Sequence, residues 1–134
     1  MNIFYNYSST IFGKSINKFD PIGLYTSKYD PSGINSIINK YTDNIKLSDC
    51  ISNLVIPAVY KDSYEMHVFR TVDAFIDPDK DYLLRDVIKA TSAAPCFFPA
   101  VDVVNVTGNK TITLVDGGVG KNDPSSFVLN DLII

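Results

Sequence analysis

The stretch LVDGGVGKNDP, residues 114–124, combines an acidic residue with several glycines at the end of an apolar segment. A strand is predicted to end at Asp116, and glycines follow at 117, 118 and 120. Strand ends are where α/β folds expose functional groups, and glycine permits positive φ angles and close approach of a neighbouring group. A carboxylate in this place can accept a proton from a nucleophile within hydrogen-bond reach. Alone, Asp-Gly-Gly also describes an ordinary turn.

The block ATSAAPCFFPA, residues 90–100, lies directly upstream and is the second unusual segment. Its small residues are predicted to end a helix that packs closely against neighbouring backbone. Aromatic residues then lie between two prolines, which force an irregular segment. The chemistry of these residues does not by itself predict a function.

Outward from these two segments, strand and helix patterns alternate, which predicts an α/β fold. Pro57 places the first strand at a sheet edge or bends it. An aspartate before each helix is predicted as its cap. The predicted strands are 53–60, 65–72, 101–106 and 111–115, with a turn at 107–110. The predicted helices are 31–41, 83–93 and one after Pro124, capped by Asp30, Asp81 and Asp123, and a helical turn is expected at 47–51 and a loop at 76–82.

Composition limits the class of protein. The chain has 134 residues, enough for one domain, and its 46% hydrophobic and 20% charged residues are typical of a globular fold. A net charge of −3 argues against a nucleic-acid partner. No apolar stretch approaches the roughly 20 residues of a membrane span. The start of the chain lacks a secretory signal, which favours the cytoplasm and leaves the localisation otherwise unknown. Cys50 and Cys96 form neither a disulfide framework nor a zinc site, and no metal or cofactor is predicted.

Taken together, the two segments resemble the patatin-like phospholipase family. That family shows an Ala-Thr-Ser-Ala-Ala-Pro…Phe-Pro run, a variable hairpin, Asp-Gly-Gly or Asp-Gly-Ala, and an Asn-Asn-Pro-like helix start. The segments KYDPSGINSIINKY, IKLSD and NLVIPAVY resemble its middle region, so the resemblance covers about residues 19–129. It implies that residues 1–134 are the C-terminal half of the domain. The implied fold is an incomplete three-layer α/β structure with a central, mostly parallel sheet and flanking helices.

The resemblance also implies a chemistry, a Ser–Asp dyad that needs neither histidine nor metal. Asp116 matches the catalytic aspartate, and Gly117 and Gly118 match its motif partners. Asn122 matches the first Asn of the helix start, whereas Asp123 replaces the second. The implied substrates are acyl esters of glycerolipids or phospholipids, with peripheral membrane contact as a further implication.

The family's nucleophile motif, Gly-x-Ser-x-Gly, has no counterpart in this sequence. The nearest string is GKSIN, residues 13–17, which lacks the second glycine, so Ser15 is interpreted as a loop serine. The glycine run of the oxyanion hole is missing too. We therefore expect a lipid acyl hydrolase represented by its C-terminal part and inactive alone. The alternative is a non-catalytic remnant, or a binding module that pairs with a separate N-terminal half or a lipid surface.

The remaining candidates favour structural roles. His67, the single histidine, lies in the middle of a predicted strand, and a Ser-His-Asp triad has no other support. The aspartates at 77, 79 and 81 resemble a calcium loop, but Tyr82 stands where that loop needs glycine. Lys121 is interpreted as a surface lysine, although it could meet anionic head groups. The glycosylation sequons are interpreted as chance and begin at Asn6, Asn105 and Asn109.

Overall fold

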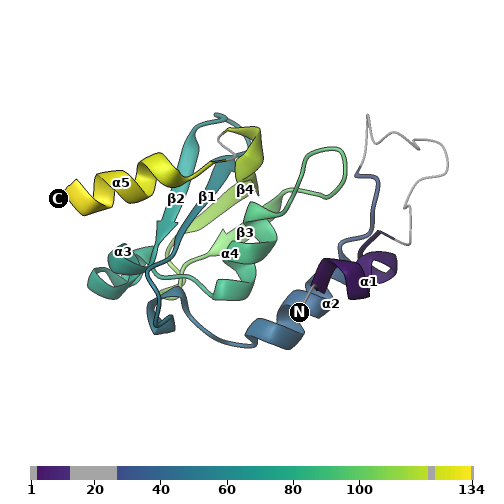
Figure 1. Ribbon diagram of the computed structural model, residues 1–134, viewed down its shortest axis with the longest axis horizontal. Helices are drawn as coiled ribbons and strands as arrows, with labels where there is room; N and C mark the ends of the chain where they lie inside the picture. The colour runs from purple at the N-terminus through teal and green to yellow at the C-terminus, as the bar shows by residue number, and fades with distance from the viewer. Residues whose placement is uncertain (1–2, 13–26, 121–122, 134) are drawn as a thin grey trace.

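The protein folds around one four-stranded sheet with helices at its face and ends (Figure 1). The computed structural model describes residues 3–12, 27–120 and 123–133. The strands lie in the order β2-β1-β4-β3. Their bounds are Val55–Tyr60 for β1, Met66–Arg70 for β2, Val101–Val104 for β3 and Thr111–Asp116 for β4.

Every strand pair in this sheet is antiparallel, so the expectation of a mostly parallel sheet was wrong. The reason lies in the connections. Residues 61–65 join β1 to β2, and residues 105–110 join β3 to β4. Loops this short can only reverse the chain, because a parallel pair needs a crossover of a dozen or more residues. The inner strands β1 and β4 also run antiparallel, with Val59 opposite Val115. The broader α/β class is confirmed.

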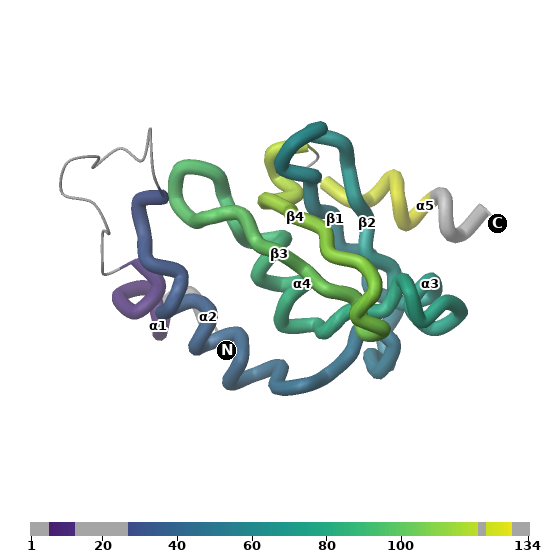
Figure 2. The backbone as a smooth tube through the Cα atoms, turned by 180° about the vertical axis from the view of Figure 1, so that it is seen from behind, coloured from purple at the N-terminus to yellow at the C-terminus, as the bar shows by residue number. Residues whose placement is uncertain are grey.

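The helices surround the sheet unevenly. The α4 helix lies across one face, α1 and α2 lie at one end, and α5 projects beyond β2 at the other (Figures 1 and 2). The short turns η1, η2 and η3 lie in the connections. The bounds are Ile3–Phe12 for α1, Ser32–Thr42 for α2, Thr71–Ile76 for α3, Leu84–Thr91 for α4 and Ser125–Ile133 for α5, with Leu47–Asp49 for η1, Pro78–Lys80 for η2 and Gly117–Val119 for η3.

The main hydrophobic core lies between the sheet and α4. Val87 and Ala90 of α4 are fully buried against Phe69 and Leu114 of the strands. Burying each large apolar side chain contributes about 1.5–3 kcal/mol. A second, smaller cluster joins α1 and α2 to the block at 90–100 through Ile11, Ile37 and Phe98.

Pro57 was predicted to place its strand at an edge or to bend it, and the edge alternative is wrong because β1 is an inner strand. The backbone N–H of Tyr60 donates to the carbonyl of Glu65 in β2. Successive residues of a strand direct their backbone groups to alternate sides, so the backbone of Pro57 faces β4. Pairing with β4 reaches only as far as Ala58 opposite Asp116. The missing N–H of proline is tolerated because the ladder to β4 has already ended there.

Most helix predictions are confirmed, with two corrections. The carboxylate of Asp30 accepts a hydrogen bond from the backbone of Ser32 at the start of α2, over 2.9 Å. Asp81 does not cap α4. It is 5% exposed and accepts from both the backbone N–H and the hydroxyl of Ser48 in η1. The α3 helix was not predicted, because Phe75 and Ile76 lie exposed and give no core-facing pattern.

Candidate functional site

Asp116 is the last residue of β4 and also caps the short turn η3. Its Oδ1 atom accepts a hydrogen bond from the backbone N–H of Gly118 over 2.7 Å. This bond fixes one carboxylate oxygen. Within the described part of the chain, no donor bonds to Oδ2. Among the described residues, the half-buried carboxylate therefore has one oxygen held by Gly118 and one that accepts no hydrogen bond.

The two sequence motifs meet at this point. The backbone N–H of Asp116 donates to the carbonyl of Ala93 over 3.0 Å. The hydroxyl of Thr91 donates to the carbonyl of Pro57 over 2.7 Å. The end of α4 is thereby bound to both inner strands of the sheet. The sequence paired the two motifs through their spacing and the family resemblance. It did not predict these roles of Thr91 and Ala93, because nothing local in the sequence marks their hydrogen-bond partners.

Gly117 is required by space and not by its backbone angle. A Cβ atom at this position would lie 2.3 Å from the carbonyl oxygen of Pro57. At Gly120, a Cβ would lie 2.3 Å from the sulfur of Met66. Positive φ angles were expected in this loop, but among the glycines that the structure describes only Gly108 has one. The close-approach part of the expectation holds at Gly117.

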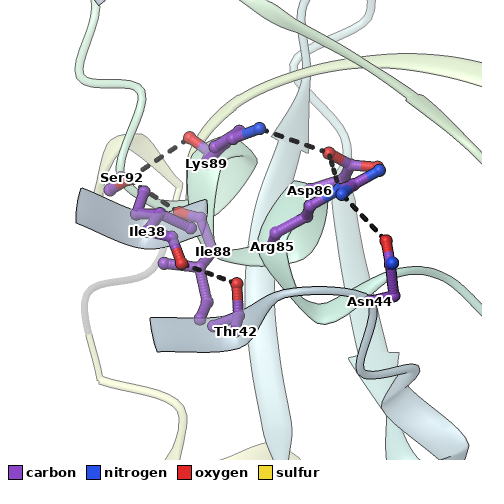
Figure 3. A network of polar contacts seen from close by, with 8 residues as sticks. All are labelled: Ile38, Thr42, Asn44, Arg85, Asp86, Ile88, Lys89 and Ser92. Atoms are coloured by element: carbon purple, nitrogen blue, oxygen red, sulfur yellow. Dashed lines mark hydrogen bonds and ion pairs between the residues drawn. The ribbon is translucent and has the colours of Figure 1, made fainter. Parts of the chain in front are cut away.

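The hydroxyl of Ser92 is engaged within α4 and does not reach Asp116. It donates to the carbonyl of Ile88 over 2.7 Å, as Thr42 does to Ile38 in α2 (Figure 3). A side-chain hydrogen bond of 3.1 Å from Arg85 to Asn44 joins α4 to the segment after α2. The α4 helix, which leads into the segment 90–100, is thus fixed at both ends.

A cavity of about 540 Å³ lies next to the end of β4 that carries the Asp116 motif. Val115 directly precedes Asp116 and lines this cavity, and Val119 follows from η3. Pro95, Phe98 and Pro99 contribute further apolar side chains to its wall. The aromatic and proline residues of the segment 90–100 therefore form a mainly apolar surface near the end of β4, and Asp116 itself is not part of the lining.

His67 does not form a triad with Asp116. Register places His67 opposite Ala58, and Ala58 opposite Asp116. Two interstrand spacings amount to about 10 Å, beyond hydrogen-bond reach. The Nδ1 atom of His67 instead lies 2.9 Å from the Tyr60 hydroxyl. Burial, with a smaller contribution from the charge of Lys110, lowers the pKa of His67 to about 4. The imidazole is therefore neutral at pH 7.

The acidic loop has structural partners. The side chain of Asp77 accepts from the backbone of Asp79, and the side chain of Asp79 accepts from Thr107 and Asn109. Within residues 3–12, 27–120 and 123–133, no group of three or more His, Cys, Asp or Glu side chains could hold a metal ion. Asn105 is only 3% exposed, which excludes its sequon from modification in the folded chain.

Three sequence candidates, Ser15, Lys121 and Asn122, lie outside the described residues. Asp123, which follows Asn122, accepts hydrogen bonds from the backbone and hydroxyl of Ser125, as expected for the cap of α5. Cys50 and Cys96 are free thiols. Among the residues that the structure describes, no helix combines the length and apolar character needed to cross a membrane.

Comparisons with known proteins identify the family of this chain. The family model described as patatin-like phospholipase matches residues 2–128. Patatin-like protein 2 of Arabidopsis thaliana is 32% identical over 108 residues, which are 78% of this chain and 26% of that protein. Patatin-like protein 2 of Oryza sativa subsp. indica is 33% identical over 108 residues, 78% of this chain and 27% of that protein.

A further relative, named "Probable inactive patatin-like protein 9" in Arabidopsis thaliana, is 29% identical over 66% of this chain and 23% of that protein. This chain thus spans about a quarter of the length of the curated relatives it matches. The family match extends over nearly the whole sequence and includes both motifs that meet at Asp116. The chain belongs to the patatin-like phospholipase family.

Proposed function

We propose that this chain supplies the catalytic aspartate, Asp116, of a lipid acyl hydrolase with a Ser–Asp dyad. The observation that carries the proposal is the position of Asp116 at a strand end, where Gly118 holds one carboxylate oxygen and the other stays available. Family membership and the matching of both motifs support the same role. The substrates proposed are acyl esters of glycerolipids or phospholipids.

The chemistry divides between this chain and a serine that it does not itself provide. The serine hydroxyl attacks the ester carbonyl and transfers its proton to the Asp116 carboxylate. The protonated carboxyl then returns the proton to the leaving alcohol, and water releases the acyl group by the same sequence. The nucleophile would come from a Gly-x-Ser-x-Gly turn outside these 134 residues, since the sequence contains no such motif.

The apolar cavity beside β4 supports a lipid substrate. Its wall of Pro95, Phe98, Val115 and Val119 has the character that an acyl chain prefers. We assign the acyl chain to this cavity and the ester carbonyl to the side of Asp116. Contact with a membrane surface would then be peripheral, with the lipid drawn from the bilayer by its acyl chain.

A complementation assay tests this function. The purified chain is assayed on a chromogenic acyl ester, alone and after co-expression with the Gly-x-Ser-x-Gly segment of a patatin-like relative. We expect negligible turnover alone and restored turnover in the pair. Asp116→Asn should abolish the restored activity by several orders of magnitude. The matched control is Asp62→Asn, a carboxylate in the exposed β1–β2 loop, which should leave activity unchanged.

Two outcomes would contradict the proposal. Restored turnover that persists in Asp116→Asn would show that another group is the base. Robust turnover of the chain alone, lost in Asp116→Asn, would show that a nucleophile lies within these residues.

An exposed apolar patch favours the second candidate, a non-catalytic module that pairs with another segment or a lipid surface. Ile51, next to η1, is fully exposed, and Val72, Phe75 and Ile76 of α3 lie exposed as well. Patches of this kind mark interaction surfaces. Under this candidate, the chain binds the nucleophile-bearing segment but the complex shows no turnover in the same assay.

A further inference from the structure

A second cavity, separate from the Asp116 motif, lies along the free edge of β2. It has a volume of about 270 Å³. Basic side chains dominate its wall, together with one carboxylate and one imidazole. Its lining includes the polar and charged residues Tyr60, His67, Arg70, Asp73, Lys80 and Lys110.

The cavity carries a net positive charge. Lys80 comes from η2 and Lys110 from the turn before β4, and the fold brings these separate segments to one cavity. Within the described residues, neither lysine forms an ion pair, so their charges are uncompensated by protein carboxylates. Arg70 and Asp73 also line the cavity and carry opposite charges, so its net positive charge comes from the two lysines. Burial is the main cause of the lowered pKa of His67, and the positive charge of Lys110 lowers this pKa further.

Neutral donors complete the lining. Glu65 is hydrogen-bonded to Tyr60 of β1, and successive residues of a strand direct their backbone groups to alternate sides. The backbone N–H of Val68, three residues further on, therefore points away from β1, to the free edge of β2 where the cavity lies. The hydroxyl of Tyr60 lies 2.9 Å from Nδ1 of His67. When Tyr60 donates this bond, the proton of the neutral imidazole is on Nε2, which becomes a further donor.

We propose that this cavity binds a phosphate group. Lysine ammonium groups are common phosphate ligands, and a tetrahedral oxyanion has enough acceptor oxygens to meet two ammonium groups and a backbone N–H together. A volume of about 270 Å³ accommodates a phosphate with a small organic substituent. The site does not include Asp116, so it is independent of the proposed hydrolase chemistry.

The sole histidine gives a direct test, because its imidazole resonances are unique in the NMR spectrum. Inorganic phosphate is titrated into the ¹⁵N-labelled 134-residue chain while the signals of His67 and the Val68 amide are followed. We expect both to shift with one saturable curve. The pKa of His67 should rise above about 4 in the presence of phosphate, because a bound anion stabilises the imidazolium form.

Paired variants make the test specific. Lys80→Gln and Lys110→Gln should each weaken phosphate affinity roughly five- to tenfold, and the double variant should lose binding. Lys46→Gln, which removes a lysine outside the cavity lining, should bind as the unchanged chain does. Binding of equal strength in the double variant would overturn the proposal. So would unshifted His67 and Val68 signals up to the solubility limit of the phosphate salt.

A flotation experiment distinguishes the two sources of the phosphate. Phosphatidylcholine vesicles with phosphatidic acid are compared with vesicles of phosphatidylcholine alone. Flotation that depends on phosphatidic acid and is lost in the double variant assigns the site to a lipid head group. Phosphate binding without flotation assigns it to a soluble phosphate compound.

Discussion

The backbone N–H of Asp116 donates to the carbonyl of Ala93 over 3.0 Å and joins the end of β4 to the end of α4. Both partners are main-chain atoms, so this bond does not depend on the side chain at either position. The carboxylate of Asp116 can therefore change without loss of the bond that positions its backbone. Asp116→Asn should fold as the unchanged chain does, which makes it a clean variant for the activity assay.

The hydroxyl of Thr91 provides the first stability prediction. Thr91→Val removes the donor to the Pro57 carbonyl and leaves that partly buried acceptor without this partner. The free energy of unfolding should fall by about 1–2 kcal/mol, measured by urea denaturation. Thr91→Ser keeps the hydroxyl and loses only a methyl group, so it should stay closer to the unchanged chain. A larger loss in Thr91→Ser than in Thr91→Val would contradict the prediction and show that packing of the methyl group matters more than the bond.

Gly117 and Gly108 are glycines for two different reasons, a lack of space for a Cβ atom at Gly117 and a positive φ angle at Gly108. Gly117→Ala places a Cβ 2.3 Å from a backbone carbonyl oxygen, which neither strand can easily move. We expect a loss of about 3 kcal/mol. Gly108 has a φ of +75° in open space, so Gly108→Ala should lose only about 1 kcal/mol. Thermal melting of both variants checks the order, and a larger loss at Gly108 would contradict it.

Local signals in the sequence predicted much of this fold. The spacing of Ile34, Ile37 and Ile38 predicted α2, and the turn around Gly108 predicted the β3–β4 hairpin, because each signal lies within a few residues of the element it specifies. The position of Asp116 at a strand end followed in the same way. Its catalytic role stays a prediction that rests on family resemblance.

Long-range features could not be predicted. Strand direction depends on which strands pair, and the pairing of β1 with β4 joins residues far apart in the sequence. Asp81 was expected to cap α4, but it bonds to Ser48 instead. This tertiary contact cannot be predicted from a local sequence pattern. The cavity at β2 was missed for the same reason, since Lys80 and Lys110 converge only after folding.

His67 predicts how stability depends on pH. The pKa of His67 is about 4 in the folded chain and 6.5 for an unperturbed histidine, as in the unfolded chain. Between these pH values the unfolded chain therefore binds a proton at His67 that the folded chain does not bind. Stability from this group is fully present above pH 6.5 and is lost as the pH falls toward 4. Urea midpoints at several pH values should therefore decline over this window. His67→Gln removes the titrating group, and its stability should decline less than that of the unchanged chain over the same window.

Phe75 and Ile76 on α3 predict self-association of the isolated chain. Both side chains are exposed, at 79% and 75%, and α3 contacts the turn η1, which shortly precedes the fully exposed Ile51. Contiguous exposed apolar surface promotes association. Phe75→Glu should shift the chain toward monomer in size-exclusion chromatography, with a change in unfolding free energy within about 0.5 kcal/mol. Ser63→Glu adds the same charge in the β1–β2 loop and controls for net charge. An equal shift in both variants would assign association to net charge, whereas a shift in Phe75→Glu alone assigns it to the apolar patch on α3.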